Sequence, residues 1–303
     1  ACLVGSEMCI RDSGNTAVVV EVNSETDFVA KNAIFQEFVQ AVADKALTVD
    51  TEKAGDGEDV VSILDMKADL DDKILKIGEK ISIRRFEKVT ADVVASYIHG
   101  GGRIGVLVAG NGASDDAAKE ALTNIAMQIA AMNPQYISRD EISADELAKM
   151  KEITIDSALN DPFSLPKPVL SKLIEKAVAG VWSAEDVAIY EEKKSNMNFL
   201  PNFLSKEAKA QLAEIACADK EEISGNKIFS GLVEGRISKQ MKEICLLDQG
   251  YVKAEDGKQT VAAYLKSVNP ALKIAKFVRF EVGEGMEKKN EDFAAEVAKQ
   301  MNV

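Results

Sequence analysis

A β-branched run that turns directly into an amphipathic helix is the feature that most restricts how this chain can fold. Thr16–Asn23 has the composition of a strand, and the heptapeptide Thr26–Asn32 (TDFVAKN) opens a predicted helix over Asp27–Leu47. Its apolar stripe is Phe35, Phe38, Val39, Val42 and Ala46. A carboxylate, Asp27, and an aromatic ring, Phe28, therefore lie at a helix N-terminus just past a strand. Taken alone, this position favours a structural role, with Asp27 balancing the positive helix end and Phe28 in the core.

The later segments repeat this mixture of strands and helices. Strands are predicted at Val93–His99, Arg103–Ala109 and Phe277–Val282, and Lys73–Val89 is predicted to form a hairpin or a bent strand pair around Gly78. Helices are predicted near Val60–Leu70, over Asp115–Met132, from a capping box at Ser143, from a cap at Ser183, over Lys227–Leu246 and over Asn290–Met301. Strands segregated from clusters of helices favour an α+β fold in two halves over a doubly wound sheet.

Charge and composition restrict the classes of partner. The 303 residues carry a net charge of −13, whereas a protein that binds duplex nucleic acid is usually basic, so we expect a protein partner and no direct nucleic acid. No apolar run approaches the ~18 residues that span a bilayer. The four cysteines, Cys2, Cys9, Cys217 and Cys245, have no Cys-x-x-Cys spacing, which indicates reduced thiols in the cytoplasm.

The motifs that could carry enzyme chemistry are weak. Gly100–Gly105 formally satisfies Gly-x-Gly-x-x-Gly, but a dinucleotide site needs a helix after this motif and Arg103–Ala109 is predicted to be a strand. His99 is the only histidine, so a triad or a metal site is disfavoured and a hydrogen bond at a turn is expected. The chain contains no Gly-x-x-x-x-Gly-Lys-Ser/Thr loop. It can therefore act on a GTPase without being one.

Three further features have ordinary structural interpretations. Arg84 and Arg85 end a strand-like segment and are predicted to be surface charges. The acidic cluster of Asp56, Glu58 and Asp59 is predicted to be solvated surface, and Trp182 is predicted to pack a local core.

Several sequence blocks occur in the order found in one protein family. These blocks are Thr26–Asn32 itself, Ser96–Gly100 followed by Arg103–Ala109, Ile125–Ala131 with Pro134, Val233–Leu247, and Arg279–Gly285 with Asp292–Val297. Together they resemble bacterial translation elongation factor Ts, the nucleotide-exchange factor for elongation factor Tu. One such match is weak, but several in order over residues 16–303 are specific.

The resemblance implies a partner-binding site and no catalytic, cofactor or metal residues. In the family, the pair matching Asp27 and Phe28 acts as a wedge that intrudes near the Mg²⁺ and GDP phosphates of elongation factor Tu. This implication reverses the structural interpretation of Phe28. The implied contact residues are Thr26, Asp27, Phe28, Val29, Gln128 and Phe293. Some members have His where this chain has Gln128, and a Gln side chain can form hydrogen bonds but cannot take up a proton to become charged.

The resemblance also implies the domain organisation. It predicts an N-terminal half at 14–102 and a C-terminal half at 103–303, with small antiparallel sheets, an antiparallel helical hairpin with an insertion at about 143–243, and a C-terminal helix that contacts the GTPase. Residues 1–13 match nothing in the family, and they stand where members have a small helical domain. We expect this peptide to lack a fixed fold, as a sequence-assembly remnant or a divergent N-terminus.

Other classes of function stay open at this point. One is a nucleotide-cofactor enzyme that uses the Gly100–Gly105 turn, and another is a helical scaffold. Nucleotide titration of the isolated protein separates the first from an exchange factor, which should bind no nucleotide alone. A homodimer within the complex with elongation factor Tu also stays open.

Overall fold

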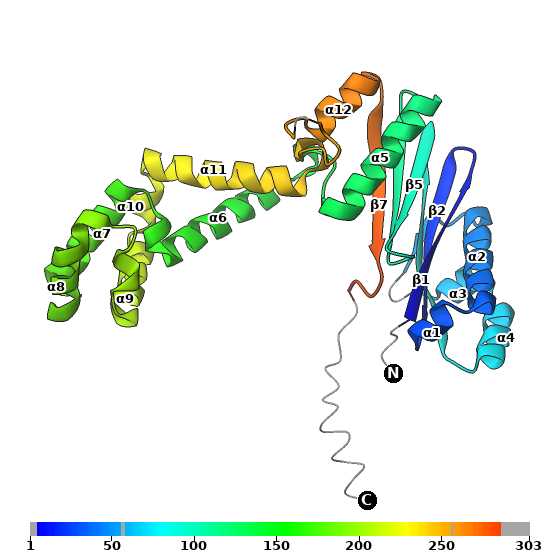
Figure 1. Cartoon of the computed structure of the whole chain (residues 1–303), viewed down its shortest axis with the longest axis horizontal. Helices are drawn as coiled ribbons and strands as arrows, with labels where there is room; N and C mark the ends of the chain where they lie inside the picture. Colours follow the sequence, from blue (N-terminus) through cyan, green and yellow to red (C-terminus); the bar gives the residue numbers. More distant parts are fainter. Residues whose placement is uncertain (1–4, 56–57, 256, 286–303) are drawn as a thin grey trace, which may run out of the picture. The chain divides into compact units, whose positions relative to one another are not determined.

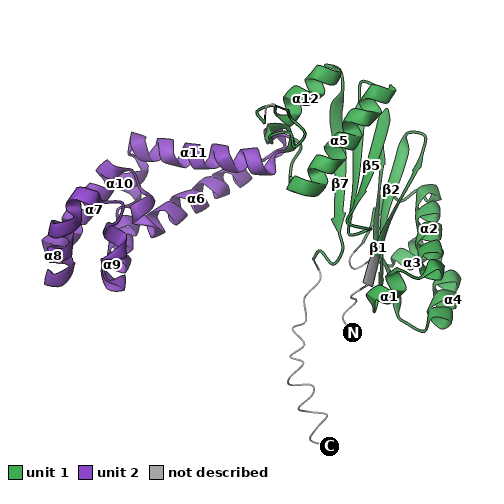
Figure 2. Cartoon of the chain, in the orientation of Figure 1, with its two compact units in different colours: residues 1–137, 246–303 green, residues 138–245 purple. Residues whose placement is uncertain are grey.

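The fold is α+β, as the sequence predicts, and it divides into two compact units. The structure, a computed structural model, describes residues 5–55, 58–255 and 257–285 (Figure 1). The first unit is formed by residues 1–137 and 246–303, and the second by residues 138–245 (Figure 2). The predicted helix over Asn290–Met301 lies outside the described residues.

Two antiparallel sheets form the first unit. The larger sheet has the order β1-β2-β4-β3, and the smaller has the order β5-β6-β7. The strands are β1 (Gly5–Ser13), β2 (Thr16–Ser24), β3 (Lys53–Ala54), β4 (Ile81–Thr90), β5 (Val93–His99), β6 (Ile104–Asn111) and β7 (Lys273–Glu281). The three strands predicted at Val93–His99, Arg103–Ala109 and Phe277–Val282 are therefore confirmed, with small shifts at their ends.

The prediction that residues 1–13 lack a fixed fold is wrong for Gly5–Ser13. This segment is a nine-residue strand that pairs with the whole of β2, from Gly5 opposite Ser24 to Ser13 opposite Thr16. The physical reason is that β2 is buried on both faces and needs a hydrogen-bonding neighbour on each side. Met8 and Cys9 of β1 are buried as a result.

Alternation along β2 explains how the layers of this unit pack. Val18, Val20 and Val22 face a core that they share with the helices on the outside of the larger sheet. Ala17 and Val19 face a second core, which contains Leu107, Ala109, Val278 and Phe280 of the smaller sheet. The two sheets thus pack against each other, and helices cover their outer faces, which gives a helix–sheet–sheet–helix arrangement.

Helices α2 (Ala33–Thr48), α3 (Val60–Ile63) and α4 (Lys67–Ile77) cover the larger sheet, and α5 (Asp116–Met132) and α12 (Val261–Val268) cover the smaller one (Figure 1). The predicted helix over Asp115–Met132 is confirmed as α5, with Asp115 as its N-cap. The predicted strand pair over Lys73–Val89 is wrong in its first part. Ile74 and Ile77 belong to α4, which ends at Gly78 in the left-handed conformation (φ 79°), before β4 begins at Ile81.

The predicted helix over Asp27–Leu47 is divided in two. A single turn, α1 (Asp27–Ala30), is followed by Lys31 and Asn32, and α2 then begins at Ala33. Asn32 has an extended backbone (φ −75°, ψ 131°), and its Oδ1 accepts a hydrogen bond from the backbone N–H of Ile34 at 2.8 Å. A new helix therefore starts after Asn32. The Asn32 side chain stabilises this start because it accepts a hydrogen bond from a backbone N–H group of the first turn, which has no partner within the helix.

The second unit is helical. It contains α6 (Ala144–Asn160), α7 (Lys167–Gly180), α8 (Ala184–Lys193), α9 (Lys206–Ala218), α10 (Lys220–Ser224) and α11 (Lys227–Ile244). The capping box between Ser143 and Glu146 and the cap at Ser183 are both present. Leu147 near the start of α6 lines one groove with Met241 near the end of α11, and Asp156 in the last turns of α6 binds Lys220 before α11 begins. The two helices are therefore antiparallel (Figure 2).

Helices α7 to α9 give this unit its own core. Trp182 is buried in it, as predicted, and its Nε1–H donates a hydrogen bond to the carbonyl oxygen of Ala208 at 2.9 Å. Short 3₁₀ turns complete the described elements at Arg139–Glu141, Pro162–Ser164, Lys194–Asn196, Leu200–Asn202 and Leu246–Asp248.

Candidate functional site

One exposed aromatic ring stands on the helical turn that follows β2. Phe28 is 83% exposed, and Asp27 beside it is also exposed. The next two residues, Val29 and Ala30, are buried in the core between α2 and the larger sheet. We call Thr26–Ala30 the wedge turn. Its buried half attaches it to the core, so its exposed half is held out from the surface.

Thr26 caps the wedge turn and is itself held from a distant part of the chain. Its extended backbone (φ −127°, ψ 152°) lets the side-chain Oγ1 accept a hydrogen bond from the N–H of Val29 at 3.4 Å. The Glu79 carboxylate accepts hydrogen bonds from the N–H of Thr26 at 3.1 Å and from its hydroxyl at 2.9 Å. The Ser24 hydroxyl donates to the carbonyl oxygen of Thr26 at 3.0 Å. Every polar group of Thr26 thus has a partner within the chain.

Asp27 contributes a charge without a partner in the described part of the chain. It occupies the first turn of α1, where a carboxylate interacts favourably with the backbone N–H groups. Within the described ranges no hydrogen bond or ion pair engages its side chain, which leaves the carboxylate oxygens open to solvent.

Gln128, another predicted contact residue, is enclosed in the first unit. It is fully buried on α5. Its Nε2 donates to Oε1 of Gln249 and to the carbonyl oxygen of Gly250, both at 3.1 Å, and its Oε1 accepts from the N–H of Val252 at 2.8 Å. The amide therefore fixes the 249–252 loop on α5, and a direct contact with a partner would require this network to open. Phe293, the last predicted contact residue, lies outside the described residues.

The glycine motif forms a β-turn region and not a nucleotide site. Gly100, Gly101 and Gly102 all have positive φ and connect β5 to β6, where the N–H of Arg103 bonds to the carbonyl oxygen of His99 at 3.1 Å. No helix follows the motif, so no helix N-terminus faces a phosphate. His99 makes the expected local contact, with Nδ1 at 3.0 Å from the hydroxyl of Tyr97.

The prediction that Arg84 and Arg85 are ordinary surface charges is wrong. Their side chains are 8% and 15% exposed, and both bind Glu21, whose side chain is fully buried. Nη1 of Arg84 lies 3.0 Å from Oε1 of Glu21, and Nε of Arg85 lies 2.5 Å from Oε2. Glu21 also accepts a hydrogen bond from the N–H of Gly283 at 3.3 Å.

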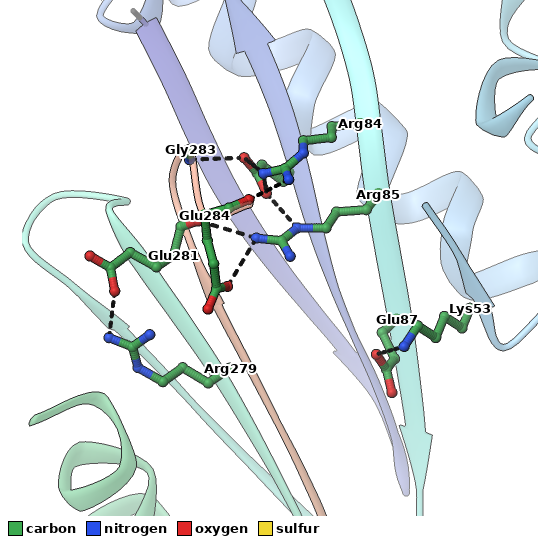
Figure 3. Close-up of polar contacts among 9 residues, drawn as sticks. Lys53, Arg84, Arg85, Glu87, Arg279, Glu281, Gly283 and Glu284 are labelled. Atoms are coloured by element: carbon green, nitrogen blue, oxygen red, sulfur yellow. Dashed lines mark hydrogen bonds and ion pairs between the residues drawn. The ribbon is translucent and has the colours of Figure 1, made fainter. Parts of the chain in front are cut away.

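A β-bulge explains why two successive arginines reach the same carboxylate. Glu21 pairs with Arg85, whereas the next residue, Val22, pairs with Ile83, so β4 has one extra residue at Arg84. A bulge cancels the usual alternation of side chains, and here it directs both guanidinium groups to Glu21. The same groups hold the end of β7, because Arg84 donates to the carbonyl oxygen of Glu284 and Arg85 donates to that of Glu281 (Figure 3). Arg85 also lies 4.1 Å above the ring of Phe280.

Sequence reasoning did not find Glu79, although Glu79 holds the cap of the wedge turn. Its distance of 53 residues from Thr26 exceeds the range of any capping or periodicity rule. The available signal was indirect: Gly78 ends a helix and Ile81 begins a strand, which places Glu79 in a tight connection beside the end of β2.

Across residues 5–55, 58–255 and 257–285, no group of three or more His, Cys, Asp or Glu side chains is placed to hold a metal ion. No helix in these ranges is both long and apolar enough to cross a lipid bilayer.

Comparisons with known proteins identify the family. A sequence model of the family described as elongation factor TS matches residues 25–284. The chain is 39% identical over 305 aligned residues to elongation factor Ts of Clostridioides difficile (strain 630), an alignment that covers 99% of this chain and 80% of that relative. The enzyme alternative based on Gly100–Gly105 is therefore wrong. This chain belongs to the elongation factor Ts family, whose members are translation elongation factors that promote nucleotide exchange on elongation factor Tu and are not enzymes.

Proposed function

We propose that this chain promotes GDP release by inserting Asp27 and Phe28 into the GTPase domain of elongation factor Tu, near the Mg²⁺ ion and the GDP phosphates. One observation carries the proposal. Phe28 is 83% exposed, whereas Val29 and Ala30, which follow it, are buried. Thr26, the N-cap of the turn, is held by a hydrogen bond to Glu79. A large apolar side chain held out on a fixed turn favours association with a protein surface.

The free-energy terms favour Phe28 as the anchor of that contact. Burying a Phe side chain contributes about 1.5–3 kcal/mol. The turn is already ordered by Thr26 and by the buried Val29, so little conformational entropy is lost when the partner binds. Asp27 adds a negative charge where the partner holds a cation and phosphate oxygens, and this charge disturbs their electrostatic balance.

Exchange then follows from the coupling of two binding equilibria. The factor binds the nucleotide-free state of the GTPase more tightly than the GDP-bound state, so its binding lowers the affinity of the GTPase for GDP. The coupling is reciprocal, so an incoming nucleotide lowers the affinity of the GTPase for the factor. No covalent step is required, which agrees with a site that consists of a ring, a carboxylate and a rigid support.

Further parts of the proposal concern the rest of the chain. The N-terminal half, 14–102, carries the wedge turn, and the C-terminal half, 103–303, docks the other domains of elongation factor Tu through surfaces outside residues 162–224. The segment containing Phe293 contacts the GTPase domain. Gln128 supports the docking surface indirectly, through the 249–252 loop. A homodimer within the complex and action in the cytoplasm remain predictions of the same proposal.

The test is release of fluorescently labelled GDP from elongation factor Tu with this protein and with its Phe28→Ala variant. We expect the variant to lose about thirtyfold in catalysed release, which corresponds to an interface anchor of about 2 kcal/mol. Phe199→Ala is the matched control, because Phe199 is also an exposed phenylalanine (57%) but belongs to the second unit. Normal release by a folded Phe28→Ala variant would overturn the wedge assignment.

A further inference from the structure

Two acidic side chains connect the start of the wedge turn to the segment that joins α4 to β4. Oε2 of Glu25 accepts a hydrogen bond from the N–H of Lys80 at 3.3 Å, and the Glu79 carboxylate accepts from both the N–H and the hydroxyl of Thr26. The strand register explains the arrangement. Ser24 pairs with Ile81 at the end of the β2–β4 ladder, so Thr26 and Glu79 each lie two residues beyond the same rung.

Glu79 holds the Thr26 hydroxyl in the orientation that the cap requires. The hydroxyl has one proton, and it donates that proton to Oε1 of Glu79 at 2.9 Å. Its lone pairs are then available to the N–H of Val29, which Oγ1 accepts at 3.4 Å. Hydrogen bonds to a carboxylate are stronger than those between neutral groups, so the capping orientation of Thr26 is stabilised over its alternatives.

The wedge turn needs such external support because it is very short. α1 has four residues, and a single helical turn is not stable by itself in water. Val29 and Ala30 attach its second half to the core, whereas its first half, which precedes Phe28, is held by the hydrogen bonds of Thr26. Glu79 is placed firmly for this task, between the C-terminal cap of α4 at Gly78 and the first residues of β4.

We propose that Glu79 is a positioning residue for nucleotide exchange. Its carboxylate fixes the Thr26 cap, and so it presents Phe28 in one direction before the GTPase is met. This inference rests on the proposed role of Phe28 as the wedge. It assigns to Glu79 no contact with the nucleotide, and it explains how an exposed ring on a single turn can act as a rigid group.

The test compares Glu79→Ala and Glu79→Gln in the full chain, with labelled GDP on elongation factor Tu as the probe. We expect Glu79→Ala to slow catalysed GDP release about tenfold at saturating factor, the effect of losing about 1.4 kcal/mol of preorganisation. Glu79→Gln keeps one acceptor oxygen for Thr26 and is expected to recover part of the rate. Asp71→Ala is the control, because Asp71 is an exposed α4 carboxylate whose partner is Lys67.

Two readouts separate positioning from a general loss of stability. Amide hydrogen exchange should accelerate at residues 26–30 in Glu79→Ala while the β2 and β4 amides remain protected. In the Phe28→Ala background, Glu79→Ala should have no further effect on release, since a residue that acts through Phe28 has nothing left to position.

Three results would overturn the inference. One is wild-type release by a folded Glu79→Ala variant. Another is a full tenfold loss that persists in the Phe28→Ala background, which would show that Glu79 acts by another route. The third is unchanged amide exchange at residues 26–30. Failure of the wedge itself is recognised separately, because it is decided by Phe28→Ala alone. If GDP release with the Phe28→Ala variant is as fast as with the wild type, both proposals are rejected. If release is slow with Phe28→Ala but normal with Glu79→Ala, only the positioning role of Glu79 is rejected.

Discussion

Phe28 and Val29 are consecutive residues of α1, yet Phe28 is 83% exposed and Val29 is 7% exposed. One turn of helix thus divides a solvent-exposed residue from a residue that the core requires. This separation is the structural basis of the proposed contact between Phe28 and the GTPase domain.

Truncation of these two neighbours should have opposite consequences. Val29→Ala is expected to lower the free energy of unfolding by about 1–3 kcal/mol, because it removes buried methyl groups. Phe28→Ala is expected to change it by less than about 0.5 kcal/mol, as for most exposed positions. Urea denaturation of both variants gives the measurement. A loss of several kcal/mol in Phe28→Ala would show that its ring is buried in solution.

The buried cluster of Glu21, Arg84 and Arg85, called here the Glu21 cluster, should be important for the stability of the first unit. Glu21→Gln removes the fully buried anion that both Arg84 and Arg85 bind. The half-exposed Glu284 carboxylate, 3.4 Å from Nη2 of Arg85, replaces only part of that charge. Breaking a buried pair in this way typically costs about 3–5 kcal/mol. The measurement is chemical denaturation.

The control for the Glu21 cluster is Lys67→Ala, which removes an exposed ion pair with Asp71. It is expected to cost less than about 1 kcal/mol. Equal effects of the two substitutions would contradict the buried role of Glu21.

Asp186 should make the second unit sensitive to acid. The pKa of its carboxyl is lowered below the usual Asp range, first by a hydrogen bond from the N–H of Ser205 and then by the Ser183 and Ser205 hydroxyls, against the opposing effect of burial. A lowered pKa means that the charged form stabilises the fold. This contribution is fully present above the unfolded pKa of about 3.9 and is lost as the pH falls through the lower folded value.

The single tryptophan, Trp182, reports on this unit directly, because it is buried in the core of the same unit. Asp186→Asn is expected to lower stability at pH 7 by about 1–3 kcal/mol, as measured by Trp182 fluorescence during urea denaturation. The difference from the wild type should shrink below about pH 4, where the wild-type carboxylate also becomes protonated. Asp72→Asn, an exposed carboxylate of α4, is the control and should leave the Trp182 transition unchanged. A difference that stays constant down to pH 2 would contradict the assignment.

Removal of helices α7 to α10 of the second unit should leave nucleotide exchange largely intact. The excision is residues 162–224, with Asp161 joined to Gly225 by a short Gly-Ser linker. The entropy of chain closure changes only slowly with the length of a connection, and α6 and α11 retain each other as packing partners. Leu159, Phe229 and Val233 lose their cover and should be replaced by Gln. GDP release from elongation factor Tu is the measurement, and a folded but inactive product would show that these helices contact the partner.

Local rules within a few residues were sufficient for much of the fold. The capping box of Ser143 with Glu146 and the cap at Ser183 were readable because each involves groups three positions apart. The strand at Thr16–Ser24 was readable from its β-branched run. Of the candidate site, the positions of Asp27 and Phe28 after a strand followed from the sequence, and the family relation followed from the ordered blocks.

By itself, then, the sequence determined many of the elements, the α+β class and the family, because these depend on local propensity, periodicity and short motifs. Only the tertiary structure decided that Phe28 faces outward, that a bulge turns Arg84 and Arg85 toward Glu21, that Gln128 is enclosed, and that Glu79 holds Thr26. Each of these outcomes depends on which distant segments the two sheets bring together. A hydrogen bond across 53 residues has no local signature, since its partners become neighbours only when β2 and β4 pair.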